Sequence, residues 1–533
     1  SVETPPLVDG DVLGDPAWDD LAPATRFVQT MPDEGQPASE RTEVRVVYTE
    51  ETIYFGIVCY DLNPAAIIVT DSRRDSSLSN SDSVQIILDT FLDQQNGFVF
   101  GTSPAGQEYD GQLVNEGAGG SGMGRGGTSF GAGGGFNLNW DGAWQVRTAI
   151  SDIGWSAEFA IPFRTIRFPT GREQTWGLNI QRNIRRRNEL VYWSPLPRQF
   201  DLFRVSMAGQ LTGVEAPEDL WRTLQVTPYI VGEALRLSDT LDKTLTTAGA
   251  IGADLKYGVT SGLTLDLTYN TDFAQVEVDE QQVNLTRFSL FFPEKREFFL
   301  EGRGVFDFAR GGIGGPGGGG FFGGGNAPTL FYSRRIGLQA GEVVPILGGG
   351  RVTGKIGQFS VGALSISTDD KAIFGTESTN FSVVRVKRDV LRRSTIGAIF
   401  TNRSVSSSRE GSSQTYGADA TLAFHDSIQM LGYYAKTETP GLAGEDTSYQ
   451  GRFGYGADRY GLQVDHLLVE NNFNPEVGFL RRDNFRRTFV EGRFSPRPES
   501  IGLVRQFRLV GSVDYILAAD TSTLETRLNR LQL

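Results

Sequence analysis

Residues 260–299 carry the pattern that most constrains how this chain folds. The segment begins with strict alternation, with Leu263, Leu265, Leu267 and Tyr269 on one face and Thr264, Asp266, Thr268 and Asn270 on the other. Successive side chains of a β-strand point to opposite faces, so the pattern predicts a strand that is apolar on one side and polar on the other. In a soluble sandwich the apolar side meets a core, whereas in a membrane barrel it meets lipid and the polar side lines the lumen.

The same alternation recurs many times between residue 222 and the C-terminus. Each run has ~9–12 residues, which is the length of a tilted strand that crosses an apolar band of ~25 Å. Tyrosines gather near the ends of the runs, as in an interfacial aromatic belt, at Tyr433, Tyr434, Tyr455 and Tyr460. Short and long connections alternate, which is typical of an up-and-down barrel with tight periplasmic turns and longer outer loops. The repetition therefore favours a membrane barrel.

The number of strands follows from counting these runs. We count about fourteen candidate strands, and the chain stops inside a further run at Leu533, whereas bacterial barrels close with an even number. We expect either that the last strands are missing from this sequence or that the count is off. Two glycine-rich stretches, 117–136 and 311–325, predict flexible surface loops.

Residues 1–215 predict a separate, compact β domain. Short runs of β-branched and aromatic residues are separated by turn signals such as Asn63-Pro64 and Asn96-Gly97. The predicted strands are 43–48, 53–60, 83–88, 98–102, 144–150, 155–161 and 176–183. Many short strands without a helical period indicate a two-sheet sandwich. We therefore expect an all-β chain, with this β-sandwich followed by an antiparallel transmembrane β-barrel over residues 216–533.

The composition excludes several classes of protein. The formal net charge is −14, from 50 basic and 64 acidic residues, whereas nucleic-acid binding needs a basic surface that neutralises phosphates. A single cysteine, Cys59, excludes a disulfide framework within the chain, and its apolar neighbours predict a buried thiol. No run reaches the ~18 apolar residues of a membrane-spanning helix. Because the sequence starts at Ser1 without methionine, we take it as a processed form.

The first 215 residues resemble a carbohydrate-binding module of family 9. The resemblance rests on Val8-Asp9-Gly10, Pro16-Ala17-Trp18, Arg41-Thr42-Glu43-Val44-Arg45-Val46, Ile53-Tyr54-Phe55-Gly56, Arg73-Arg74-Asp75, Ser81-Asp82, Leu88-Asp89, Gly154-Trp155-Ser156-Ala157-Glu158 and Ile161-Pro162-Phe163. It implies a sandwich of the kind that binds sugar.

The rest of the chain resembles the DUF5916-type domain of unknown function, which commonly follows such a module in outer-membrane proteins of Gram-negative bacteria. The shared motifs are Thr264-Leu265-Asp266-Leu267-Thr268, Asn270-Thr271-Asp272-Phe273-Ala274-Gln275-Val276-Glu277, Asn284-Leu285-Thr286, Phe291-Phe292-Pro293-Glu294-Lys295-Arg296, Phe298-Phe299-Leu300-Glu301-Gly302 and Tyr332-Ser333-Arg334-Arg335-Ile336-Gly337. The two resemblances imply a sugar-binding-like sandwich fused to an outer-membrane barrel, with no demonstrated activity.

Sugar binding needs flat apolar faces with carboxylates and amides around them. In family 9 modules paired aromatic residues serve this role, and calcium supports the loops. The candidates for sugar stacking are Trp140, Trp144 and Trp193, which lie near loops rich in Asn, Asp and Gly. The alternative is that these rings fill the sandwich core, which is the role that we expect for Trp155 and Trp176.

A calcium site is the one cofactor that the resemblance implies. Asp82, Asp89, Asp93 and Asn96 offer oxygen donors around a strand and its turn. Calcium takes six to eight oxygen ligands, so Asp61 or Asp110 would have to contribute as well. The alternative is a solvated acidic turn without an ion.

Three further groups of charged residues predict internal ion pairs. The segment 291–306, part of an expected insertion at residues 287–327, has too many charges between its aromatic residues to face lipid. We expect it to fold into the lumen or over the rim, with Glu294, Lys295, Arg296, Glu297 and Glu301 paired with one another. Arg182 and the arginines at 185–187 should pair with an acidic face or with the block at 291–299. Glu158 should pair with Arg73, Arg74 or Arg167.

Three functions remain open. The first is a non-enzymatic outer-membrane barrel whose sandwich, on the periplasmic side or in the lumen, takes part in binding, sensing or passage of carbohydrate. The second is a structural or assembly component whose sandwich docks an envelope protein. The third is a glycan-processing hydrolase, but the two histidines, His425 and His466, lie in barrel-like strands, so no Ser-His-Asp arrangement can form in the first domain. The expected partners are outer-membrane lipid and a glycan, and not nucleic acid.

Overall fold

The computed structural model describes most of the chain. It leaves out residues 20, 118–134, 139, 170, 218–223, 237–244, 261, 271–287, 289, 293, 295, 301, 310–325, 340–341, 371–376, 392, 409, 426, 499–503 and 505. Both glycine-rich stretches therefore lie almost wholly outside the described residues. Within the described ranges, no helix is long and apolar enough to cross a membrane.

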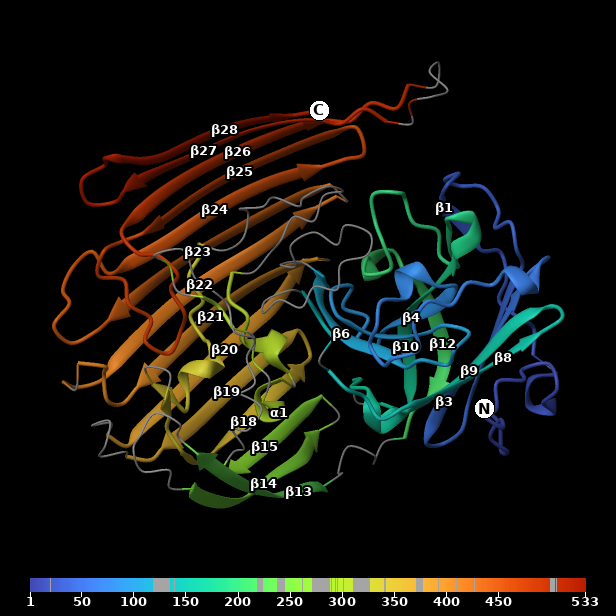
Figure 1. The fold of residues 1–533 in the computed structure, drawn as a ribbon, viewed down its shortest axis with the longest axis horizontal. Helices are drawn as coiled ribbons and strands as arrows, with labels where there is room; N and C mark the ends of the chain where they lie inside the picture. Colours follow the sequence, from blue (N-terminus) through green and yellow to red (C-terminus); the bar gives the residue numbers. More distant parts are fainter. Residues whose placement is uncertain are drawn as a thin grey trace.

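The chain folds into two β parts that lie side by side (Figure 1). Over the described residues, the first is a sandwich of a four-stranded and an eight-stranded sheet, and the second is one antiparallel sheet of fourteen strands that curls like the wall of a barrel. The predicted all-β class and the count of fourteen strands are confirmed.

The sandwich sheets have the orders β2-β3-β9-β8 and β1-β11-β10-β4-β5-β6-β7, with β12 also paired to β10. The strands are β1 Val28–Met31, β2 Thr42–Tyr48, β3 Thr52–Tyr60, β4 Ser83–Asp89, β5 Gly97–Thr102, β6 Tyr109–Gly117, β7 Gly135–Asn137, β8 Gln145–Ser151, β9 Gly154–Pro162, β10 Glu173–Ile184, β11 Glu189–Tyr192 and β12 Gly209–Glu215. Short 3-10 helices lie at Pro16–Trp18, Pro64–Ala66, Leu78–Asn80, Phe163–Thr165, Arg185–Arg187 and Val205–Met207. All seven strands predicted in this part are present.

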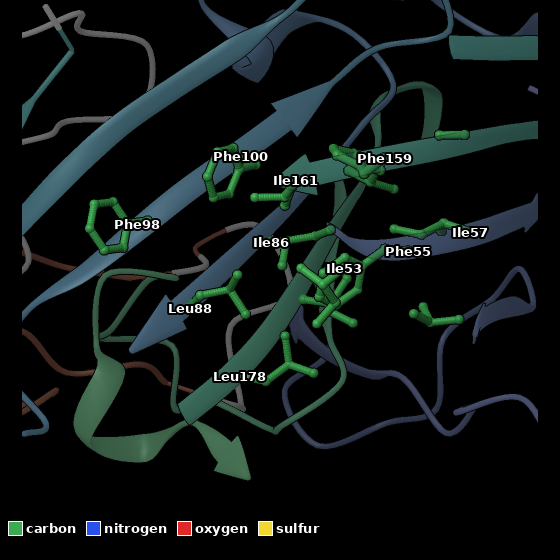
Figure 2. Close-up of a cluster of buried hydrophobic side chains, with 14 of the residues drawn as sticks. Ile53, Phe55, Ile57, Ile86, Leu88, Phe98, Phe100, Phe159, Ile161 and Leu178 are labelled. Carbon is green, nitrogen blue, oxygen red and sulfur yellow. The ribbon is translucent and has the colours of Figure 1, made fainter. Parts of the chain in front are cut away.

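The core of the sandwich forms where the apolar faces of the two sheets meet (Figure 2). Ile53, Phe55 and Ile57 alternate along β3 and are fully buried, and Ile86 and Leu88 of β4 meet them from the other sheet. Burial of each such side chain contributes about 1.5–3 kcal/mol to folding. Trp155 and Trp176 lie in this core, as the sequence predicts.

One buried carboxylate ties the amino-terminal segment to the sandwich. Glu158 of β9 accepts hydrogen bonds from the backbone N–H groups of Asp9 and Gly10, at 2.9 and 2.8 Å, and from Nε1 of Trp18 at 2.8 Å. Burial raises the pKa of the Glu158 carboxyl group above its usual value. The expected arginine partner is wrong, because these three N–H donors hold both carboxylate oxygens.

The large sheet runs in chain order from β13 to β28, and within the described residues β13 and β28 are its two unpaired edges. Its strands are β13 Leu224–Arg236, β14 Leu245–Thr260, β15 Leu263–Tyr269, β18 Ile346–Ile356, β19 Phe359–Thr368, β20 Thr379–Leu391, β21 Ser394–Arg403, β22 Ser413–Phe424, β23 Ile428–Glu438, β24 Thr447–Gly456, β25 Tyr460–Val469, β26 Phe485–Phe494, β27 Leu509–Ala518 and β28 Leu524–Gln532. Between β15 and β18 lie α1 Glu297–Leu300, the 3-10 helices Arg303–Phe306 and Ser333–Arg335, and the small strands β16 Leu338–Gln339 and β17 Glu342–Val343.

The large sheet has the opposite polarity to the sandwich. Along β20, Val384, Val386 and Val390 are exposed on the outer face, Val384 at 46%, whereas Arg385 on the inner face is only 1% exposed. In β15 the apolar side chains of Leu267 and Tyr269 are exposed, and Thr264, Asp266 and Thr268 on the other face are buried. The opening alternation of the sequence therefore encodes an apolar outside and a polar inside.

The charges on the inner face are paired across strands. Arg351 lies 2.8 Å from Asp266, and Arg452 lies 2.7 Å from Asp465. Arg385 contacts both oxygens of Asp419, at 2.6 and 2.8 Å, and Arg487 contacts both oxygens of Asp514, at 2.8 and 2.9 Å. A guanidinium group suits this role because its planar fork matches the two oxygens of a carboxylate.

The described residues between β15 and β18 lie on the concave side of the sheet (Figure 1). We call residues 288–345 the inner segment. Its Phe298, Phe299 and Phe306 form a second hydrophobic core with inner side chains of the sheet, including Ile366 and Val383. The interior of the curled sheet is thus filled by the chain itself.

Candidate functional site

The sandwich meets the large sheet at the end where its connections are short. Most adjacent strands at that end are joined within a few residues, as between Ile356 and Phe359 or Leu391 and Ser394, with the connection 494–509 as a longer one. The connections at the other end include the longer ones at residues 368–379, 403–413, 438–447 and 469–485. A cavity of about 140 Å³ lies between the two parts. We call it the interdomain cavity. At one water molecule per ~10–15 Å³, it has room for on the order of ten waters.

Three aromatic side chains give the interdomain cavity an apolar wall. Phe98 of β5 and Phe91, in the turn after β4, line it together with Trp140. The Trp140 ring lies 5.1 Å from the ring of Phe98 and is half-buried. Trp140 thus combines support from the core with a face toward the cavity, as stacking on a sugar ring requires.

Two of the three tryptophans expected to stack on sugar lie elsewhere. Trp144 is 6% exposed and stacks on Phe159 at 5.7 Å, inside the sandwich core. Trp193 is half-buried, packs against the same core and covers Gly209. Among the described residues lining the cavity, Trp140 is the one tryptophan. The structure therefore does not bring the three rings together, and Trp144 has no free face for a ligand.

The charged side chains that line the cavity are mostly basic. They are Lys355 of β18, Lys387 of β20 and Arg167 of the sandwich, with Asp93 as the single carboxylate among the described lining residues. Thr264, Thr353, Ser360 and Gln112 add hydroxyl and amide groups. The wall can therefore donate and accept hydrogen bonds around the aromatic surface.

The turn after β4 holds three of the residues expected to bind calcium. Asp89 accepts backbone hydrogen bonds from Asp93 and Gln94, and Asp93 accepts them from Gln95 and Asn96. Burial and the neighbouring Asp93 carboxylate raise the pKa of Asp89 to about 7. The cation at this turn is the Lys355 ammonium group, 2.6 Å from Asp93 Oδ2.

The other calcium candidates lie apart from this turn and have their own partners. Asp61 pairs with Arg186 at 2.6 Å, and Asp110 pairs with Arg74 at 2.8 Å. Asp82 accepts a hydrogen bond from the backbone N–H of Ile68 at 2.8 Å. Within the described ranges, no group of three His, Cys, Asp or Glu side chains is arranged to hold a metal ion. The structure does not assemble the predicted set of six ligands.

Within the described residues, Arg186 and Arg187 form the predicted ion pairs, whereas Arg182 and Arg185 donate to neutral acceptors. Arg186 also pairs with Glu40, at 2.6 Å, and Arg187 pairs with the same carboxylate at 2.9 Å. Arg182 is buried and donates to the backbone oxygens of Arg41 and Tyr60. These contacts join the two sheets of the sandwich through charged groups.

The docking of the sandwich on the large sheet depends on a few charged contacts. Lys355 lies 2.7 Å from Asp389 in addition to its contact with Asp93. Glu116 of β6 lies 2.7 Å from Arg393, in the turn after β20, and 3.1 Å from Arg204. The inner segment also approaches β6 closely. A Cβ atom at Gly304 would lie 2.5 Å from a methyl group of Val114, so a larger residue there would require a local shift at this contact.

The charged residues of the inner segment are paired where they are described. Glu294 and Arg296 are both 1% exposed and lie 2.7 Å apart. Arg296 also donates to the backbone oxygens of Ser333 and Ile336 and lies over the Phe299 ring. Lys295 and Glu301 lie outside the described residues, as does the side chain of Glu297.

Sequence reasoning missed the basic half of the cavity wall. Lys387 lies in an alternating stretch with Arg385, so the pattern does place both on the polar face of one strand. Nothing in the sequence indicates that Lys387 and Lys355 meet Trp140, because both lysines lie in the large sheet, more than two hundred positions after Trp140 in the sandwich. Only the docking of the sandwich brings them together.

Comparison with known proteins supports part of the expected resemblance. A family model described as "Domain of unknown function (DUF5916)" matches residues 222–346. No curated protein matches the chain. The DUF5916 resemblance is therefore confirmed for the beginning of the large sheet and the inner segment.

The solved structures that are similar to this chain are distant. A Bacteroides uniformis protein named as a proposed carbohydrate-binding protein has a TM-score of 0.29 at 13% identity, covering 38% of this chain and 92% of that chain. A BenF-like porin from Pseudomonas fluorescens and OccAB1 from Acinetobacter baumannii have TM-scores of 0.20 and 0.18 at 9% identity, each covering 84% of this chain and 96% of its own. Such low scores carry no functional argument, so function has to be argued from the residues.

Proposed function

We propose that this chain is an outer-membrane protein of a Gram-negative bacterium that binds carbohydrate between a periplasmic sandwich and the end of its curled sheet. The observation that carries the proposal is the polarity of the large sheet. Its exposed outer face presents valine, leucine and tyrosine, while its inner face holds buried ion pairs. This arrangement suits a strand wall with lipid outside and polar groups inside.

The position of the sandwich supports a periplasmic location for it. In outer-membrane barrels short turns face the periplasm and long loops face outward. Lys355 and Arg393, which contact the sandwich, both lie at the short-turn end. A saccharide that reaches the interdomain cavity would meet the Trp140 ring on one side and hydroxyl and amide groups on the other.

A charge on the outer face tests the membrane part of the proposal. Val384 lies at mid-strand in β20, paired with Ala363 and Phe400. We expect Val384→Arg to destabilise the protein folded into lipid vesicles by about 2–4 kcal/mol, because an arginine at the bilayer midplane is costly. Ser382→Arg, nearer the strand end on the same face, is the matched control and should cost less, since the penalty falls toward the interface. Equal and small effects for both variants would contradict a lipid-facing sheet.

Loss of the Trp140 ring tests the ligand part. The protein in detergent is screened against an oligosaccharide array, and the affinity of each hit is measured by calorimetry. Trp140→Ala should weaken binding at least tenfold, or ~1.4 kcal/mol. Trp193→Phe is the control, because Trp193 lies outside the cavity lining. Unchanged affinity in Trp140→Ala, or a failure of every saccharide to bind, would remove the cavity as a sugar site.

A further inference from the structure

The interdomain cavity holds the ammonium group of Lys387, which forms no ion pair with the described residues. Nζ of Lys387 donates a hydrogen bond to the backbone oxygen of Gly304 at 3.0 Å. The carboxylates in its surroundings are Asp307, Asp389 and Asp419. Within the described part of the chain, none of the three forms an ion pair with Lys387: Asp389 pairs with Lys355, and Asp419 pairs with Arg385.

The charge of the cavity contrasts with the charge of the chain. The whole sequence carries a formal charge of −14, yet the described residues that line the cavity include three cations and one carboxylate, Asp93. Asp93 is already 2.6 Å from Lys355. Withdrawing an ammonium group from water is unfavourable unless a charged or strongly hydrogen-bonding partner replaces the water. An anionic group on a ligand would supply that partner.

We propose that the interdomain cavity selects saccharides that carry an anionic group, with Trp140 stacking on a sugar ring and Lys387 binding the anion. The inference rests on the proposed function and names the ligand class of the same site. A carboxylate of a uronic acid and a sulfate ester share the required chemistry, since each accepts charge-assisted hydrogen bonds from an ammonium group. Lys387 is the residue that sets specificity, and Trp140 supplies affinity for the ring.

The test compares ligands that share the same sugar rings and differ in whether they carry the anionic group. Trigalacturonic acid and its fully methyl-esterified form have the same rings, and a sulfated galactose tetrasaccharide with its desulfated form makes a second pair. Binding to the full chain in detergent is measured by calorimetry at low salt. We expect each anionic ligand to bind roughly 10–100-fold more tightly than its neutral partner, the range of one charge-assisted hydrogen bond. Preference for the carboxylate or for the sulfate pair identifies the natural source of the charge.

Variants assign the preference to Lys387. Lys387→Met should abolish the difference between charged and esterified ligands while binding of the neutral form is retained. Arg388→Met is the matched control, because the neighbouring Arg388 lies over the Phe359 ring on the exposed outer face. It should keep the full preference. Equal binding of acid and ester to the unaltered protein would overturn the inference, and this outcome can be read without any variant. It would leave the proposed function intact. If neither form of either saccharide binds, the proposed function fails as well.

Discussion

Replacement of Lys355 tests how the two parts of the molecule are held together. Its ammonium group lies 2.6 Å from Asp93 in the sandwich and 2.7 Å from Asp389 in β20, and the side chain is 10% exposed. In Lys355→Met both carboxylates keep their positions and lose the cation that they share. Removing one partner of a buried ion pair costs roughly 3–5 kcal/mol, because an uncompensated charge stays buried.

The expected effect lies toward the lower end of that range. Asp93 keeps two backbone donors, the N–H groups of Gln95 and Asn96, at 2.8 Å each. A loss of about 3 kcal/mol corresponds to a change of more than a hundredfold in the docking equilibrium, since 1.4 kcal/mol is tenfold. The double variant Lys355→Met with Asp93→Asn also removes the negative charge of Asp93, one of the two carboxylates that lose the lysine. We expect it to recover ~0.5–3 kcal/mol relative to the sum of the single variants.

The sequence provides a direct readout of this effect. All seven tryptophans precede residue 222, so tryptophan fluorescence during urea unfolding in detergent reports on the sandwich and on the residues that directly follow it. Lys355→Met should lower the unfolding midpoint. Lys436→Met is the matched control, because Lys436 is 45% exposed and lies 3.9 Å from Asp446, a surface pair worth about 0–1 kcal/mol. If the two variants unfolded at the same urea concentration, the reasoning about the docking contact would be refuted.

Two more substitutions probe the inner segment and the amino-terminal anchor. Arg296→Met removes the ion-pair partner of Glu294 and should destabilise the packing of the inner segment by roughly 3–5 kcal/mol. The conductance of the protein in a planar bilayer should therefore rise. Unchanged conductance would argue against a fixed inner segment. Glu158→Gln removes a buried acceptor and should destabilise the sandwich by about 1–3 kcal/mol. The folded pKa of Glu158 is raised above 4.5, so its contribution to stability is complete below that pH and declines as the pH rises through the folded pKa. The unaltered sandwich should therefore lose stability over this window more steeply than Glu158→Gln, and equal slopes would contradict the assignment.

The sequence alone determines that the sandwich and the large sheet are both built from β-strands, because the pattern that specifies a strand lies within a few consecutive residues. A period of two fixes which side chains of a strand share a face, so the polar face of Thr264, Asp266 and Thr268 and the apolar face of Leu267 and Tyr269 follow from spacing. The ion pairs of Arg186, Arg187 and Arg296 follow from similar reasoning, because an acidic chain offers many carboxylates to its basic groups.

Tertiary structure decides which side chains from distant parts of the sequence lie next to one another. Trp140 and Trp144 are four positions apart in similar surroundings, yet one ring lines the cavity and the other is enclosed by Phe100 and Phe159. The sequence predicts a calcium ion at the acidic turn after β4, and the cation that the structure places there is Lys355, 262 positions away from Asp93. No local pattern encodes such a meeting, because it depends on how two separately folded surfaces pack against each other.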